Sequence, residues 1–232
     1  MLFKILSLDP GLTNLGWAIS TYDSEKNHLT THKYGRYQAS KTAQKDKQNV
    51  AIYGQRIISV SLLREEIKRL IDLYKPTHIA SEDVFLHIKH INAYAALTMC
   101  MFAIKDAAMS KHMVVYTIPP RAVKKLAAST GEADKIQVCN SILHASDVTV
   151  IDNKQNPISK MTEHESDAIA VAKAFSIHFV PQLLTPAPDI ELEDQDIKRK
   201  RRVIKREPEF IVPITANTPK KVKPVPKKKK KK

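Results

Sequence analysis

Three carboxylates and one histidine fall where predicted elements of secondary structure end or begin. Asp9 closes an apolar segment just before a Pro-Gly turn, and Glu82 lies in a second short apolar segment. His164 and Asp167 are three residues apart near the start of a predicted helix, so they share one helix face. Oxygen ligands from strand ends and a packed helix suit Mg²⁺ or Mn²⁺. Two such ions, about 3.5–4 Å apart, can activate a water and stabilise the leaving oxygen in phosphodiester hydrolysis.

Each of these residues also has an ordinary structural interpretation. An aspartate before Pro-Gly is commonly a turn former, and a histidine such as His164 is common at helix ends. Glu82 and Asp83 are adjacent, so on a strand they point to opposite faces, and only one can face a given site. Asp167 is harder to explain structurally, because an acid within an apolar helical run requires a partner.

The elements that would position these residues follow from hydrophobic periodicity and turn residues. Five strands are predicted, at residues 3–9, 15–22, 29–37, 79–84 and 114–118. Helices are predicted at 50–75, 92–109, 121–128, 134–145 and 162–179, and the segments 39–49 and 147–157 are predicted as loops. Thr162 and Glu165 match the capping-box pattern at the start of the last helix. Strands that come first and then alternate with helices indicate an α/β domain with a mixed five-stranded sheet flanked by helices.

Composition restricts the class of protein. The chain has 232 residues, of which 43% are hydrophobic, so it is not a wholly disordered protein. It has no run of about 18 apolar residues, so we expect neither a membrane span nor secretion. Cys100 and Cys139 form neither a disulfide framework nor a zinc motif, which favours a reducing compartment.

The net charge of +14 is concentrated at the C-terminal end. Residues 181–232 carry 16 of the 38 Lys and Arg residues and eight of the 13 prolines, and they contain no glycine. Such a segment buries too little apolar surface to fold. We therefore predict a folded domain at 1–180 and a disordered basic tail at 181–232. The tail would bind DNA, another protein or an import receptor, or it would only solubilise the chain.

Several segments together resemble one family. LDPGLTNLGWAI, IASEDVF and HESDAIAVA, in this order, resemble the RuvC-type Holliday-junction resolvases, whose domain has the RNase H-like fold. Between the last two, RAVK and GEADKIQV also resemble segments of the family. The resemblance covers about residues 3–178, and several segments in register are far more specific than any one of them.

The resemblance implies roles for the four candidate site residues. Asp9 would bridge the metal ions, Glu82 would be the second ligand, and Asp167 would be the ligand from the last helix. His164 falls where members carry Asp or His, and would bind or position a metal and its water. Glu163 is an alternative fourth ligand, because it lies four residues before Asp167. The implied cofactor is Mg²⁺ or Mn²⁺, with two ions per active site.

Contacts with DNA are implied at three further positions. Phe85 matches an aromatic residue used against bases at the junction, and Lys124 and Lys135 match residues that contact phosphates of the scissile strand. Phe85 would alternatively pack in the core, and the two lysines would alternatively belong to a solvated face. The segment LHIKHINAY after Val84-Phe85 does not align with the family, so His87, Lys89 and His90 are assigned either to DNA contact or to a solvated loop.

The leading prediction is a metal-dependent, structure-selective endodeoxyribonuclease. It would resolve four-way DNA junctions by paired symmetric nicks, as a homodimer, in DNA recombination and repair. It would act in the cytoplasm or nucleoid or in a viral replication compartment, and the basic tail would also suit the nucleus. The alternatives are an RNase H-like or flap nuclease with a broader substrate range and a non-catalytic junction-binding protein. An actin-like ATPase is disfavoured, because the chain lacks a second glycine-rich phosphate loop.

Overall fold

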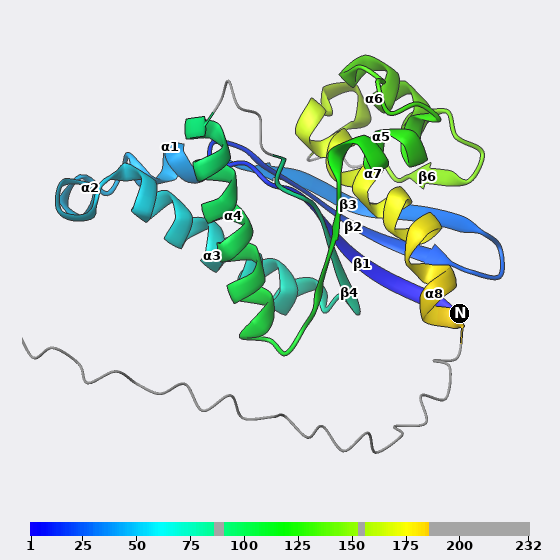
Figure 1. The fold of residues 1–232 in the computed structure, drawn as a ribbon, viewed down its shortest axis with the longest axis horizontal. Coiled ribbons are helices and arrows are strands. Elements are labelled where there is room, and N and C mark those ends of the chain that lie inside the picture. The colour runs from blue at the N-terminus through cyan, green and yellow to red at the C-terminus, as the bar shows by residue number, and fades with distance from the viewer. Residues whose placement is uncertain (86–90, 153–155, 186–232) are drawn as a thin grey trace, which may run out of the picture. The chain divides into compact units, whose positions relative to one another are not determined.

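A mixed six-stranded sheet forms the centre of the fold (Figure 1). The computed structural model describes residues 1–85, 91–152 and 156–185. The strands lie in the order β5-β4-β1-β2-β3-β6. Their bounds are Leu2–Asp9 (β1), Leu15–Asp23 (β2), His28–Tyr37 (β3), His78–Glu82 (β4), Val115–Ile118 (β5) and Val148–Val150 (β6).

The pairing of the strands sets the edge at which the candidate site lies. β1, β2 and β3 form an antiparallel meander, whereas β4 runs parallel to β1 and β5 runs parallel to β4. Leu8 of β1 lies beside Ser81 of β4, so Asp9 and Glu82 follow at the same edge of the sheet. The α/β fold with a helix-flanked mixed sheet is confirmed.

The sheet has one strand more than the five expected. β6 lies in the segment 147–157, which the sequence predicts as a loop, and it pairs in parallel with β3 from Leu29 to Thr31. Three residues are too few to show the alternation of a strand, so only the pairing partner reveals this one.

The helices follow the sequence prediction, with three corrections. They are α1 (Ala39–Ala43), α2 (Lys47–Tyr53), α3 (Gln55–Tyr74), α4 (Ile91–Met109), α5 (Pro120–Ala128), α6 (Lys135–Leu143), α7 (Glu163–His178) and α8 (Val180–Leu184). The predicted helix 50–75 is two helices, because Gly54 separates α2 from α3 with a φ of 83°, which favours glycine. The predicted loop 39–49 contains α1, and α8 extends into the predicted tail.

Two apolar cores cover the two faces of the sheet (Figure 1). Leu6 and Leu8 of β1 belong to the core with α3 and α4. Phe3 and Ile5 belong to the core with α5, α6 and α7. Because side chains alternate along a strand, Asp9 shares the face of Phe3 and Ile5 and points toward α7.

The described residues belong to one compact unit, Met1–Ala187. The disordered tail predicted at 181–232 begins too early, because residues up to Leu184 belong to α8; from residue 186 onward the tail lies outside the described residues. Of the helices in the described ranges, none has the length and apolarity that a membrane crossing requires.

Candidate active site

Asp9 and His164 meet at the edge of the sheet. Asp9 is the last residue of β1, and His164 lies in the first turn of α7. The two side chains share a hydrogen bond of 2.8 Å between His164 Nδ1 and Asp9 Oδ2. Burial raises the pKa of Asp9, although the hydrogen bond with His164 opposes this shift. The same hydrogen bond raises the pKa of His164, which favours an imidazolium beside the carboxylate.

Gly16 allows α7 to approach the sheet closely enough for this contact. It lies in β2 directly opposite Asp9. A Cβ atom on Gly16 would lie 1.9 Å from the carbonyl oxygen of His164, a distance that no pair of non-bonded atoms tolerates. Any side chain at this position would therefore push the first turn of α7, with His164, away from Asp9.

Glu82, and not Asp83, lies on the face of Asp9. It ends β4, two residues after Ala80, which packs in the core with α7. Burial raises the pKa of Glu82 to about 8, and the nearby charges of Asp9 and Asp167 contribute to the shift. The Asp83 carboxylate instead accepts a hydrogen bond of 2.8 Å from the backbone N–H of Val84. Of the two adjacent acids, Glu82 lines the cavity of Asp167 and the two lysines, whereas Asp83 borders the second cavity, near Asp9.

Asp167 completes the acidic group from α7. Burial raises its pKa to about 6, with a further contribution from the charge of Asp9. Asp167 and Glu82 line one cavity of about 250 Å³, together with Lys124 and Lys135. The structure therefore brings together all four residues that the sequence singled out, from β1, β4 and α7.

The donor set of this site suits a hard divalent cation. Three carboxylates with raised pKa values lie close enough to influence one another, and an imidazole is hydrogen-bonded to one of them. Such a group is stabilised by a cation that binds the ionised carboxylates. Among the described residues, no three Asp, Glu, His or Cys side chains are already arranged around one ion position. The residues fit a divalent ion in chemistry, and their side chains would have to converge to bind it.

Glu163 is paired with a lysine, although its charge also raises the pKa values of Asp9 and Asp167. Its Oε2 forms an ion pair of 2.7 Å with Nζ of Lys135, whereas its Oε1 lies 3.7 Å from Nε2 of His164. This ion pair lowers the pKa of Glu163, in contrast to the raised values of Asp9, Glu82 and Asp167. Of the two alternatives for a fourth ligand, the structure places His164 and not Glu163 against Asp9.

Phe85 lies at the mouth of the site. Its side chain is 60% exposed, so it does not pack in the core. It lines a second cavity, of about 280 Å³, with Asp9, Glu82 and Leu97. The candidates His87, Lys89 and His90 lie outside the described residues.

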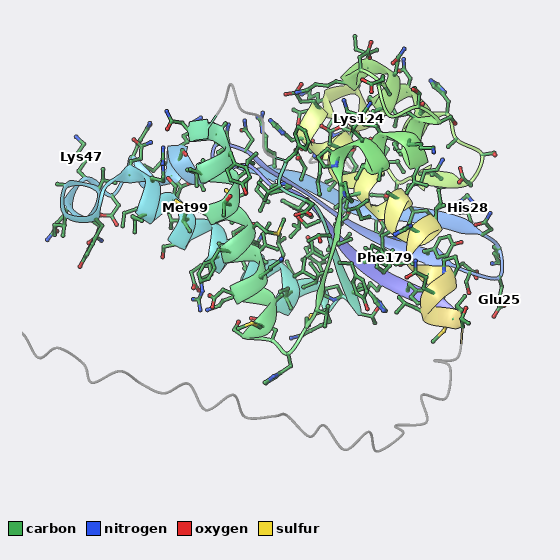
Figure 2. All side chains as sticks on the ribbon, viewed as in Figure 1. Glu25, His28, Lys47, Met99, Lys124 and Phe179 are labelled. Carbon is green, nitrogen blue, oxygen red and sulfur yellow. The ribbon has the colours of Figure 1, made fainter. Side chains whose placement is uncertain are left out.

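Lys124 lies on the α7 side of the sheet and lines the acidic cavity. Figure 2 labels it on α5, and labels Met99 on α4, which covers the opposite face. The predicted cations Lys124 and Lys135 therefore approach the acids from α5 and α6 respectively.

Sequence reasoning missed two features of the site. The close approach at Gly16 has a weak signal, since a glycine inside a strand often marks a site where another backbone comes near. The pair between Lys135 and Glu163 has no sequence signal, because it depends on how α6 packs against α7.

Comparison with known proteins agrees with the family resemblance of the sequence segments. A profile of the family "Crossover junction endodeoxyribonuclease RuvC" matches residues 5–175. The protein of that name from Orientia tsutsugamushi (strain Boryong) is 29% identical over 175 residues, which are 75% of this chain and 95% of the relative. The one from Finegoldia magna is 26% identical over 170 residues, which are 73% and 90% of the two chains.

Solved structures show the same fold. The chain is similar to Thermus thermophilus RuvC with a TM-score of 0.56 and 20% identity, covering 76% of this chain and 93% of the other. The T. thermophilus protein in complex with a Holliday junction substrate gives a TM-score of 0.57 at 17% identity, covering 75% and 93%.

Proposed function

Because the chain belongs to the RuvC family of crossover junction endodeoxyribonucleases, we propose that it resolves four-way DNA junctions by metal-dependent cleavage at the Asp9–Glu82–His164–Asp167 site. The observation that carries the proposal is the group of buried carboxylates at one sheet edge, with His164 hydrogen-bonded to Asp9. The relatives from F. magna and O. tsutsugamushi, which align with 73% and 75% of this chain, are both named crossover junction endodeoxyribonuclease.

Asp9, Glu82, Asp167 and His164 would hold the divalent ions, which we propose to be two Mg²⁺ or Mn²⁺ ions. When bound, such ions lower the pKa of a water nucleophile and stabilise charge on the phosphate. The protein supplies the buried carboxylates, which must lose their protons to act as ligands. His164, whose Nδ1 is hydrogen-bonded to Asp9 Oδ2, would bind an ion or position the attacking water.

The cations and the aromatic side chain around the acids suit a DNA strand. Lys124 and Lys135 line the same cavity as Glu82 and Asp167, where they would bind phosphates on either side of the scissile bond. Phe85 projects at the mouth of the second cavity, where it would contact an unstacked base. Recognition would rest mainly on the shape of the branch and the positions of its phosphates. The basic tail would add affinity that is independent of sequence and sensitive to salt.

A homodimer would supply the two nicks that resolution requires, because one chain carries one such site. α4 presents exposed apolar side chains on its outer surface, with Phe102 72% exposed and Met109 70% exposed. Exposed apolar groups of this size favour burial against another protein surface. In a twofold dimer, the same face of each copy would contact the other.

Substitution of the acids tests the metal site. Asp9→Asn and Asp167→Asn should each reduce junction cleavage about 100-fold or more, since several kcal/mol of transition-state stabilisation depend on the ions. Binding of an uncleaved junction should persist, because neither residue binds phosphate. Asp72→Asn on α3 is the matched control, and it should cleave normally because α3 packs on the face of the sheet opposite to α7. Normal cleavage by both Asp9 and Asp167 variants would show that the site is wrong.

A further inference from the structure

The ion pair between Lys135 and Glu163 joins the first residues of two helices at the entrance to the site. Lys135 begins α6 and Glu163 begins α7, and their Nζ and Oε2 atoms are 2.7 Å apart. Lys135 also lines the cavity that contains Glu82 and Asp167. One of the two lysines that line this cavity is therefore already bound to a carboxylate of its own chain.

Capping hydrogen bonds fix the N-termini of α6 and α7. The ion pair between Lys135 and Glu163 can therefore open by movement of the two side chains alone. The capping box of α6 pairs Asp134 with Gln137, through hydrogen bonds of 2.9 and 2.8 Å. In α7 the backbone N–H of Thr162 donates to Glu165 at 2.6 Å. Lys135 therefore extends from an anchored backbone, and its flexible side chain can turn from Glu163 to another anion.

The solvent exposure of the Lys135–Glu163 ion pair indicates that another anion can replace Glu163. The Lys135 side chain is 61% exposed and that of Glu163 is 44% exposed. Exposed ion pairs of this kind contribute little to stability, so another anion can displace the carboxylate. The acids in the adjacent cavity are buried and have raised pKa values, whereas Glu163 lies outside that group.

We propose that Glu163 occupies the place of a backbone phosphate on Lys135, and that DNA must displace it to bind. This inference rests on the proposed function, because it assumes that Lys135 receives a phosphate. Glu163 is then a positioning residue that acts through Lys135, and neither a metal ligand nor a catalytic residue. Its carboxylate keeps Lys135 directed into the site between substrates, and it competes with every phosphate that reaches the lysine.

A double-mutant cycle on junction binding tests the proposal. Binding of a labelled four-way junction is measured by fluorescence anisotropy in EDTA, so that neither cleavage nor metal binding contributes. Glu163→Gln should lower the Kd about threefold, which is the effect expected from removing an exposed competing ion pair. In a Lys135→Met background, the same substitution should leave the Kd unchanged. Glu163→Asp, which keeps the charge, should bind as the wild type does.

Two controls separate this competition from general electrostatic effects and from misfolding. Glu132 forms an ion pair with Arg121 on the same side of the fold, so Glu132→Gln removes an equal charge without releasing Lys135. Its effect on the Kd should be the same in both Lys135 backgrounds. Circular dichroism and thermal melting of each variant establish that it is folded.

The possible results of the binding measurements distinguish a failure of this inference from a failure of the proposed function. An equal gain in affinity from Glu163→Gln with and without Lys135 would mean that Glu163 only repels DNA, which overturns the inference. Weaker binding by Glu163→Gln would mean that the carboxylate assists Lys135, which also overturns it. Failure of the wild-type protein to bind the junction would instead contradict the proposed function, and the inference with it.

Discussion

Each buried carboxylate of this site has opposite effects on the stability of the protein and on its function. Asp9, Glu82 and Asp167 all have raised pKa values, because burial disfavours their ionised forms, and the charge of Asp9 adds to the shifts of Glu82 and Asp167. Each ionised acid destabilises the metal-free protein, and the same ionised acids are the form that binds a divalent ion. Stability and metal affinity should therefore respond to pH in opposite directions.

The effect of pH on stability can be measured through Glu82. Its pKa is raised from 4.5 to about 8, so between these values the folded protein retains a proton that the unfolded chain has lost. Stability without metal therefore falls as the pH rises from 4.5 to 8. Glu82→Gln should raise Tm at pH 8 in EDTA by about 5 °C and leave it nearly unchanged at pH 4.5. An equal change in Tm at both pH values would contradict this assignment.

The identity of most site residues could be predicted from the sequence, but their partners could not. Asp9, Glu82 and Asp167 have the residue type and position at element ends that metal ligands require. The family resemblance selects Glu82 over Asp83, and the register of β4 gives the physical reason, since Glu82 follows Ala80 on the face that packs against α7. The partner of Lys135 lies on another helix, so only the packed fold identifies it.

At the level of elements, the site depends on how closely α7 packs on the sheet. α7 is buried along most of its length, and its first two turns carry His164 and Asp167. The sequence predicts its start well, because the capping box between Thr162 and Glu165 is a local signal. The sequence does not predict β6, whose three residues form a strand only because β3 lies beside them.

Gly16→Ala tests this packing directly. A Cβ at residue 16 would overlap the backbone of His164, so α7 must shift, at a cost of about 1–3 kcal/mol. Both Tm and metal-dependent cleavage should fall, because His164 moves away from Asp9. Gly54→Ala is the control: its φ of 83° makes it destabilising too, but no atom lies within 4 Å of the new Cβ. Full cleavage by Gly16→Ala would show that the close approach does not position the site.

At the level of the whole molecule, different faces of the sheet have different roles. The acids and the two lysines gather on the side covered by α5, α6 and α7, whereas the exposed apolar residues of α4 lie on the opposite side. A dimer through α4 would therefore leave both acidic cavities open to DNA. This arrangement matches the requirement of junction resolution for two separate cuts.

Phe102→Glu should convert the proposed α4 dimer into monomers, whereas the unsubstituted protein should have the mass of a dimer. A charge at the centre of an apolar interface is costly, and the side chain is 72% exposed in the single chain, so the fold should persist. Light scattering after size-exclusion chromatography gives the mass of each variant. Ile177→Glu on α7 is the matched control, since Ile177 is also exposed but lies on the other side of the sheet. A Phe102→Glu variant that stays dimeric would place the interface elsewhere.

Cleavage of a synthetic four-way junction tests the central claim most directly. The junction is compared with a linear duplex, a flap and an RNA–DNA hybrid, each with and without Mg²⁺ or Mn²⁺. We predict paired nicks at symmetric positions on the junction alone, and only when a divalent metal is present. Cleavage of the hybrid or the flap in preference to the junction would keep the metal site and contradict the substrate. Tight junction binding without cleavage under any metal condition would contradict the enzymatic account itself.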